Sequence, residues 1–262
     1  MRRLGKLARR WAAPLSWIVC STTAAAAPVD PTDLWWNPSE SGWGMYVMRG
    51  GDTLFATLAV YDVASRGTFY TTALSLGGTT WSGDLYESRG PYVGATRYDP
   101  SLVTLRKVGT LAFQQDSANA GTLDYSVDGI GVRKGVERFL LAYDDYTGTY
   151  PVSVQRVVAR CSDSAANGDR TTLESFAITH RQTTIALKWT SATRTCDFAG
   201  AFAQAGRLGS AQGSYACSDG ESGDFAFSEL TRHDNFIAGR FQGHGITDGC
   251  DYRGKFSGFV PD

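Results

Sequence analysis

The feature that most constrains the fold is a series of short segments in which apolar and polar residues alternate between turn residues. Residues 42–49 alternate, Gly50-Gly51-Asp52 is typical of a turn, and residues 53–61 alternate again. A period of two places every second side chain on one face of a β-strand, and a glycine-rich turn between two such segments indicates an antiparallel hairpin. Apolar residues do not recur at helical spacing over more than two or three turns. The sequence therefore predicts an all-β protein.

The alternating segments fall into two sets. The first set of expected strands is 42–49, 53–61, 68–76, 79–87, 107–115, 122–127 and 132–143. The second set is 152–161, 173–180, 184–189, 196–202, 211–217, 223–230, 236–241 and 252–259. Residues 144–151 break the pattern between them. We therefore predict two consecutive domains, 28–146 and 147–262, each a small antiparallel β-barrel or a strongly curved β-sandwich.

Glycine followed two positions later by an aromatic residue is a second recurring pattern. It occurs at Gly67/Phe69, Gly148/Tyr150, Gly200/Phe202, Gly213/Tyr215, Gly223/Phe225, Gly239/Phe241 and Gly254/Phe256. Residues two apart on a strand share a face, so an aromatic ring can cover the bare glycine of its own or a neighbouring strand. Small barrels use such glycines where the sheet bends sharply. Most of the pairs lie in the second half, which favours a closed or strongly curved sheet there.

Residues 1–26 have the organisation of a secretory signal peptide. Basic residues between Arg2 and Arg10 precede the apolar stretch 11–20 and the small residues 24–27, and we expect cleavage after Ala26. An apolar stretch of about ten residues is too short to span a membrane, which takes about 20. The sequence therefore predicts an exported protein without a membrane span, located in the periplasm or the medium.

Four cysteines follow the signal peptide, and all of them lie in the second domain. In an exported chain, Cys161, Cys196, Cys217 and Cys250 indicate two disulfides with three possible connectivities. Cys196 and Cys217 are symmetric about the expected turn Gly206-Arg207, and an eight-stranded up-and-down barrel would place all four cysteines at one end. We favour Cys196–Cys217 with Cys161–Cys250, and Cys161–Cys196 with Cys217–Cys250 stays open. No pair has the C-x-x-C spacing of a zinc site, so we expect no metal.

Charge and motifs exclude several functional classes. Five of the 25 basic residues lie in the first ten positions, so the rest of the chain is acidic and lacks the basic surface of a nucleic-acid-binding protein. There is no G-x-S-x-G elbow, H-E-x-x-H motif, P-loop or dinucleotide fingerprint. His180, His233 and His244 all lie in the second half, which does not fit the histidine-first order of a two-barrel serine protease. We expect no catalytic residue and no cofactor, although a hydrolase with a carboxylate cluster stays an alternative.

Three tryptophans stand out as candidate ligand-binding residues. Trp35, Trp36 and Trp43 lie within nine residues and surround the turn Asn37-Pro38-Ser39. The indole offers a large apolar face and an N–H donor, which suits stacking on a sugar ring. The same properties suit a tryptophan that fills the end of a barrel, so core packing is the competing interpretation, and a protein-binding surface is a third.

The segment Asp33–Gly44, continued by Thr53–Thr57 and Tyr61-Asp62, resembles a family of exported proteobacterial proteins of unknown function. Members of this family carry the motif D-x-W-W-N-P-x-E-S-G-W-G. Looser matches occur at 121–125, at 136–139 and in the region of Cys196–Cys217. The resemblance implies export and an all-β fold, and it supplies neither an activity nor catalytic residues.

Together these features favour an exported, non-enzymatic binding module. Its expected partner is a glycan, another cell-surface ligand or a protein, with no nucleic acid. One alternative is a secreted inhibitor or immunity protein that blocks an extracellular hydrolase with its loops. Another is a carrier that holds a small molecule inside a barrel, and an interior filled by the glycine-paired aromatic residues would count against it.

Overall fold

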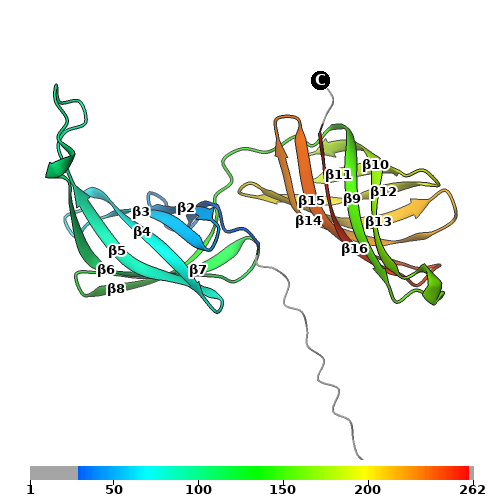
Figure 1. The fold of residues 1–262 in the computed structure, drawn as a ribbon, viewed down its shortest axis with the longest axis horizontal. Helices are drawn as coiled ribbons and strands as arrows, with labels where there is room; N and C mark the ends of the chain where they lie inside the picture. Colours follow the sequence, from blue (N-terminus) through cyan, green and yellow to red (C-terminus); the bar gives the residue numbers. More distant parts are fainter. Residues whose placement is uncertain (1–28, 260–262) are drawn as a thin grey trace, which may run out of the picture.

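Sixteen antiparallel strands make up the computed structural model, which describes residues 29–259 (Figure 1). The first eight strands form one closed barrel and the last eight form another. Each strand pairs with its sequence neighbours, and the first and last strands of each set pair to close the barrel. The predicted all-β fold with two consecutive barrels is confirmed. The expected signal peptide, residues 1–26, lies outside the described residues.

The strands follow one another in simple up-and-down order. The first barrel consists of β1 (Asp33–Trp36), β2 (Gly44–Gly50), β3 (Thr53–Tyr61), β4 (Gly67–Gly77), β5 (Thr80–Arg89), β6 (Thr104–Gln115), β7 (Ala120–Val127) and β8 (Ile130–Arg138). The second consists of β9 (Gly148–Ala159), β10 (Gly168–Arg181), β11 (Thr184–Thr190), β12 (Thr195–Ala205), β13 (Leu208–Cys217), β14 (Ser222–His233), β15 (Phe236–Gly245) and β16 (Asp251–Phe259). Within residues 29–259, no helix is long and apolar enough to cross a membrane.

Alternation along each strand fills the barrel interior. In β3, Leu54, Ala56 and Leu58 point inwards and are fully buried, whereas Phe55 between them is exposed. Burying a leucine side chain stabilises the fold by about 1.5–3 kcal/mol, so one strand of this kind contributes substantially to its core. All the expected strands overlap observed ones, because the barrel imposes the period of two on the sequence.

Strand β1 was not expected from the sequence. It is only four residues long, and its run Leu34-Trp35-Trp36 hides the alternation. In the structure, Trp35 pairs with Met45 of β2 and with Arg138 of β8, so this short strand closes the first barrel. The strand expected at 132–143 ends earlier, at Arg138, because the chain then leaves the barrel.

Aromatic rings cover glycines of neighbouring strands, as predicted for a strongly curved sheet. Phe241 of β15 is paired with Gly254 of β16, and Gly239 is paired with Phe256. A Cβ atom at Gly254 would lie 2.7 Å from the Phe241 ring and still closer to the carbonyl oxygen of Gln155. Glycine is therefore required at position 254, where ring and backbone approach closely.

Two disulfides link strands at one end of the second barrel. Cys196–Cys217 joins paired positions of β12 and β13, and Cys161–Cys250 joins the segments that follow β9 and precede β16. This is the connectivity favoured from the sequence. Disulfides persist in oxidising compartments, so they are compatible with an exported protein.

The opposite end of the second barrel contacts the first barrel. Arg207, in the turn between β12 and β13, donates from Nε to the carbonyl oxygen of Thr32 at 2.7 Å and pairs with Asp30 at 2.6 Å. Its backbone N–H also donates to Asp33. These contacts supplement the covalent connection through residues 139–147.

Candidate functional site

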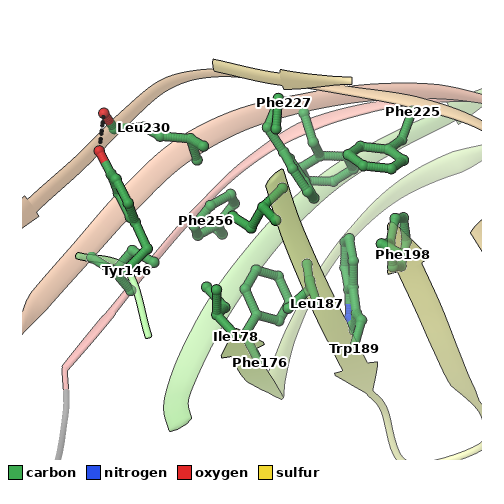
Figure 2. Close-up of a cluster of buried hydrophobic side chains, with 14 of the residues drawn as sticks. Tyr146, Phe176, Ile178, Leu187, Trp189, Phe198, Phe225, Phe227, Leu230 and Phe256 are labelled. Carbon is green, nitrogen blue, oxygen red and sulfur yellow. Dashed lines mark hydrogen bonds between the residues drawn. The ribbon is translucent and has the colours of Figure 1, made fainter. Parts of the chain in front are cut away.

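The two ends of the second barrel are closed to different degrees. At the end that faces the first barrel, Tyr146 is fully buried and donates its hydroxyl proton to the carbonyl oxygen of Leu230 at 3.0 Å (Figure 2). The rings of His180 and Phe202 pack against Tyr146, each with centroids 5.4 Å away. The connection between the barrels therefore supplies the residue that fills this end.

The other end, where the disulfides lie, contains a cavity. About 50 Å³ of it is accessible to the centres of water molecules. By this measure one water needs about 10–15 Å³, so the cavity has room for about four waters, roughly the volume of one six-membered ring. It is lined by Arg156, Trp189, Ser191, Arg194, Cys196, Phe198, Tyr215, Phe225, Phe227, Phe241, Gln242, Gly243 and Tyr252.

Five of these residues form an aromatic box, namely Trp189, Phe198, Tyr215, Phe225 and Phe241. Phe198 stacks on Trp189 at 5.6 Å and on Tyr215 at 5.0 Å between ring centroids. Phe225 meets Phe198 edge-on at 5.2 Å, and Phe241 meets Trp189 edge-on at 5.3 Å. Each ring is thus held by another, and Figure 2 shows Trp189, Phe198 and Phe225 on the side of the core away from Tyr146. Such walls suit a flat apolar ligand.

A buried carboxylate fixes one wall of the box. Glu174 of β10 accepts hydrogen bonds from Trp189 Nε1, from the Arg156 guanidinium and from the Thr172 hydroxyl, the last at 2.6 Å. The side chain of Glu174 is 1% exposed and that of Arg156 is 15% exposed. The Arg156 guanidinium also lies 5.3 Å from the centroid of the Trp189 ring. Glu174 therefore orients both a box residue and the arginine beside it.

Two polar atoms at the cavity are buried without a hydrogen-bond partner. They are the hydroxyl of Tyr215 and Nε of Arg156. Burial, together with the negative charges of Glu221 and Asp248, raises the pKa of Tyr215 to about 12. The hydroxyl therefore keeps its proton at neutral pH. Because buried polar groups are normally paired, these two atoms are unusual.

The loops around the cavity, here called its rim, are held together by contacts of their side chains. Arg194 Nη1 lies 3.3 Å from Asp219, and the Tyr252 hydroxyl donates to Asp248. Burial is the main factor that raises the pKa of Tyr252, and the bond to Asp248 adds to it. The buried carboxylate of Glu221 accepts backbone N–H groups on both neighbouring loops, those of Ser222, Thr247 and Asp248. Together with the disulfides, these contacts pre-form the rim.

The three candidate tryptophans lie in the first barrel, away from this cavity. Trp35 is fully buried, donates from Nε1 to the carbonyl oxygen of Pro31 and meets Phe113 at 5.0 Å. Its faces are inside the core, which matches the competing packing interpretation. Trp36 and Trp43 are half-buried, and Trp43 Nε1 donates to Glu40 at 3.3 Å. A ligand-binding role for these two residues stays a prediction.

The histidines do not assemble into a common site. His244 Nδ1 lies 2.8 Å from Asp251, whereas His233 lies at the opposite end of the β14–β15 hairpin. Among residues 29–259 there is no group of three histidine, cysteine or acidic side chains placed to hold a metal ion.

Fold and site together define a two-barrel protein whose disulfide-linked second barrel holds a ring-sized cavity. No protein-family model and no curated protein matches the chain. Among solved structures, the chain is similar to a protein from Bacteroides fragilis NCTC 9343 described as a "putative outer membrane protein". Identity is 12%, the match covers 79% of this chain and 88% of that one, and the TM-score is 0.32. A likeness this distant carries no argument, and membership of the tryptophan-motif family stays a prediction.

Proposed function

We propose that this chain is an exported, non-enzymatic binding protein that holds a small, ring-sized ligand in the cavity of its second barrel. The observation that carries the proposal is the aromatic box at one end of a barrel whose other end is filled by Tyr146. Eight-stranded barrels are just wide enough to be filled by side chains or to hold one small ligand. Here aromatic and aliphatic side chains fill the core, and a cavity lies at the disulfide end.

This proposal ranks the carrier alternative above a glycan site on the tryptophan motif. Stacking on a sugar needs an accessible indole face, and Trp35 offers none because it is fully buried. The box of the second barrel has an accessible cavity instead. The glycine-paired aromatic residues fill much of the interior, so the ligand is limited to about the size of one ring.

The test is a nuclear magnetic resonance titration of the oxidised chain, residues 27–262, with ethylbenzene and acetophenone. The indole N–H signal of Trp189 reports on the cavity, since this is the only tryptophan after residue 146. Trp81, buried in the core of the first barrel, is the internal control. We expect a saturable shift of the Trp189 signal and none of the Trp81 signal. If neither compound moves Trp189, or if both signals move alike, the proposal is wrong.

A further inference from the structure

The polar atoms left unpartnered at the cavity are hydrogen-bond donors. The Tyr215 hydroxyl belongs to a side chain that is 8% exposed, and Nε of Arg156 is likewise buried; neither has a partner. An arginine Nε can only donate, and a protonated phenol donates one hydrogen bond. A buried donor without an acceptor costs free energy, and a ligand that supplies the acceptor removes this cost.

The nearby carboxylates accept hydrogen bonds from groups other than these two donors. Glu174 accepts three hydrogen bonds, and Asp219 pairs with Arg194. Asp248 accepts the backbone N–H of Cys250 at 2.8 Å and the hydroxyl of Tyr252. The acids therefore balance the arginines and hold the loops, while the two donors, on residues that line the cavity, have no partner.

We infer that the ligand is a flat ring bearing an acceptor oxygen, a carbonyl or a carboxylate, which the Tyr215 hydroxyl and Arg156 Nε hold while the aromatic box covers the ring. This inference rests on the proposed function and names its ligand class. Aromatic boxes also bind cations in some proteins. Here the charged residues that line the cavity, Arg156 and Arg194, are both cationic, which disfavours a positively charged ligand.

The experiment compares four one-ring probes: ethylbenzene, acetophenone, benzoate and benzylammonium. Dissociation constants are measured by the Trp189 titration for the wild-type chain, for Tyr215→Phe and for Tyr252→Phe. Tyr252 lines the same cavity, but its hydroxyl is already bonded to Asp248, so Tyr252→Phe is the matched control. Tyr215→Phe keeps the stacked ring and removes a hydroxyl that has no partner, so the variant is expected to fold.

We expect Tyr215→Phe to weaken acetophenone about three- to tenfold, the worth of one neutral hydrogen bond, and to leave ethylbenzene unchanged. Benzoate should weaken by about tenfold or more, because its acceptor is charged. Tyr252→Phe is expected to leave the ratio of acetophenone to ethylbenzene affinity unchanged. A second measurement needs no variant: the ¹³Cζ signal of Tyr215 in the wild-type chain should move further with acetophenone than with ethylbenzene, because only acetophenone accepts its proton.

The outcomes separate this inference from the proposed function. Equal weakening of ethylbenzene and acetophenone in Tyr215→Phe, or the same ¹³Cζ shift with both, would overturn the acceptor class while cavity binding stands. Tightest binding of benzylammonium would overturn it as well, because the box would then be a cation site. If no probe shifts Trp189, the proposed function itself fails.

Discussion

Replacing the buried carboxylate of Glu174 by an amide is expected to destabilise the second barrel by about 2–4 kcal/mol. The side chain is 1% exposed and accepts hydrogen bonds from Arg156, Trp189 and Thr172. Removing one partner of a buried ion pair costs about 3–5 kcal/mol, because the other charge is left uncompensated. Arg156 keeps 15% exposure, so water stabilises part of its charge and the expected loss is somewhat smaller. Glu174→Gln preserves the shape, so the effect reports charge rather than a cavity.

The assay is urea unfolding at pH 7, followed by circular dichroism. Both disulfides lie in the second barrel, so the transition that moves on reduction belongs to that barrel. With a urea dependence of about 2 kcal/mol/M, its midpoint should fall by about 1–2 M in Glu174→Gln. The control is Asp197→Asn on β12, two strands from β10, where the exposed pair with Lys188 at 3.4 Å should contribute less than about 1 kcal/mol.

A double-mutant cycle decides whether the effect comes from the ion pair. Arg156→Gln alone leaves Glu174 without its cation, whereas the double variant Arg156→Gln/Glu174→Gln removes both charges. The double variant should therefore be more stable than the sum of the single losses predicts, by at least about 1 kcal/mol. If the stability losses of the two single variants add up to that of the double variant within about 0.5 kcal/mol, the two charges do not stabilise each other and the argument is refuted.

Two further outcomes follow from other buried positions. Burial lowers the pKa of His180, so the folded chain takes up this proton at a lower pH than the unfolded chain, whose histidine has a pKa of about 6.5. Stability is therefore lost as the pH falls below about 6.5. Urea unfolding of His180→Phe at pH 7 and pH 5 should show a smaller loss than the wild-type chain, and an equal loss would contradict the assignment. Gly254→Ala should lower the thermal stability of the second barrel by about 1–3 kcal/mol, because its new methyl group would crowd Phe241 and the β9 backbone. The control is Gly131→Ala, which has nothing within 4 Å of its Cβ and should change the stability of the first barrel by less than about 1 kcal/mol. Equal effects would show that crowding is not the cause.

Most of the fold could be predicted because a barrel core imposes alternation on every strand long enough to display it. In β9, Tyr150, Val152 and Val154 are buried while the residues between them are exposed. The alternation pattern did not predict β1. Its four residues are held in the strand conformation by pairing with β2 and β8, and their own sequence does not alternate. The end of β8 at Arg138 was equally hidden, since an apolar run begins at Phe139, directly after the strand.

The candidate site could be predicted only in part. The cysteine spacing located the disulfide end, but the candidate ligand-binding residues were the three tryptophans of the first barrel, and no residue of the aromatic box was among them. A signal was present: Arg156 shares the inward face of β9 with Val152 and Val154, and Glu174 shares that of β10 with Phe176. A charge at an inward position of a small barrel needs a partner. No local sequence pattern shows at which end of the barrel the cavity lies. Its position depends on Tyr146, which lies outside the strands and fills the other end.

Two arginines at inward positions, Arg138 and Arg156, differ in how far the protein satisfies their hydrogen-bond donors. Arg138 of β8 is fully buried, yet it pairs with Asp33 and donates to the carbonyl oxygens of Asp30, Thr32 and Ala118. Nε and both terminal nitrogens of Arg138 therefore have protein partners, and the residue stabilises the junction between the barrels. Arg156 is less buried but keeps Nε unpartnered beside a cavity. Folding alone would favour a paired donor there, and the proposed ligand would supply the acceptor that the protein does not.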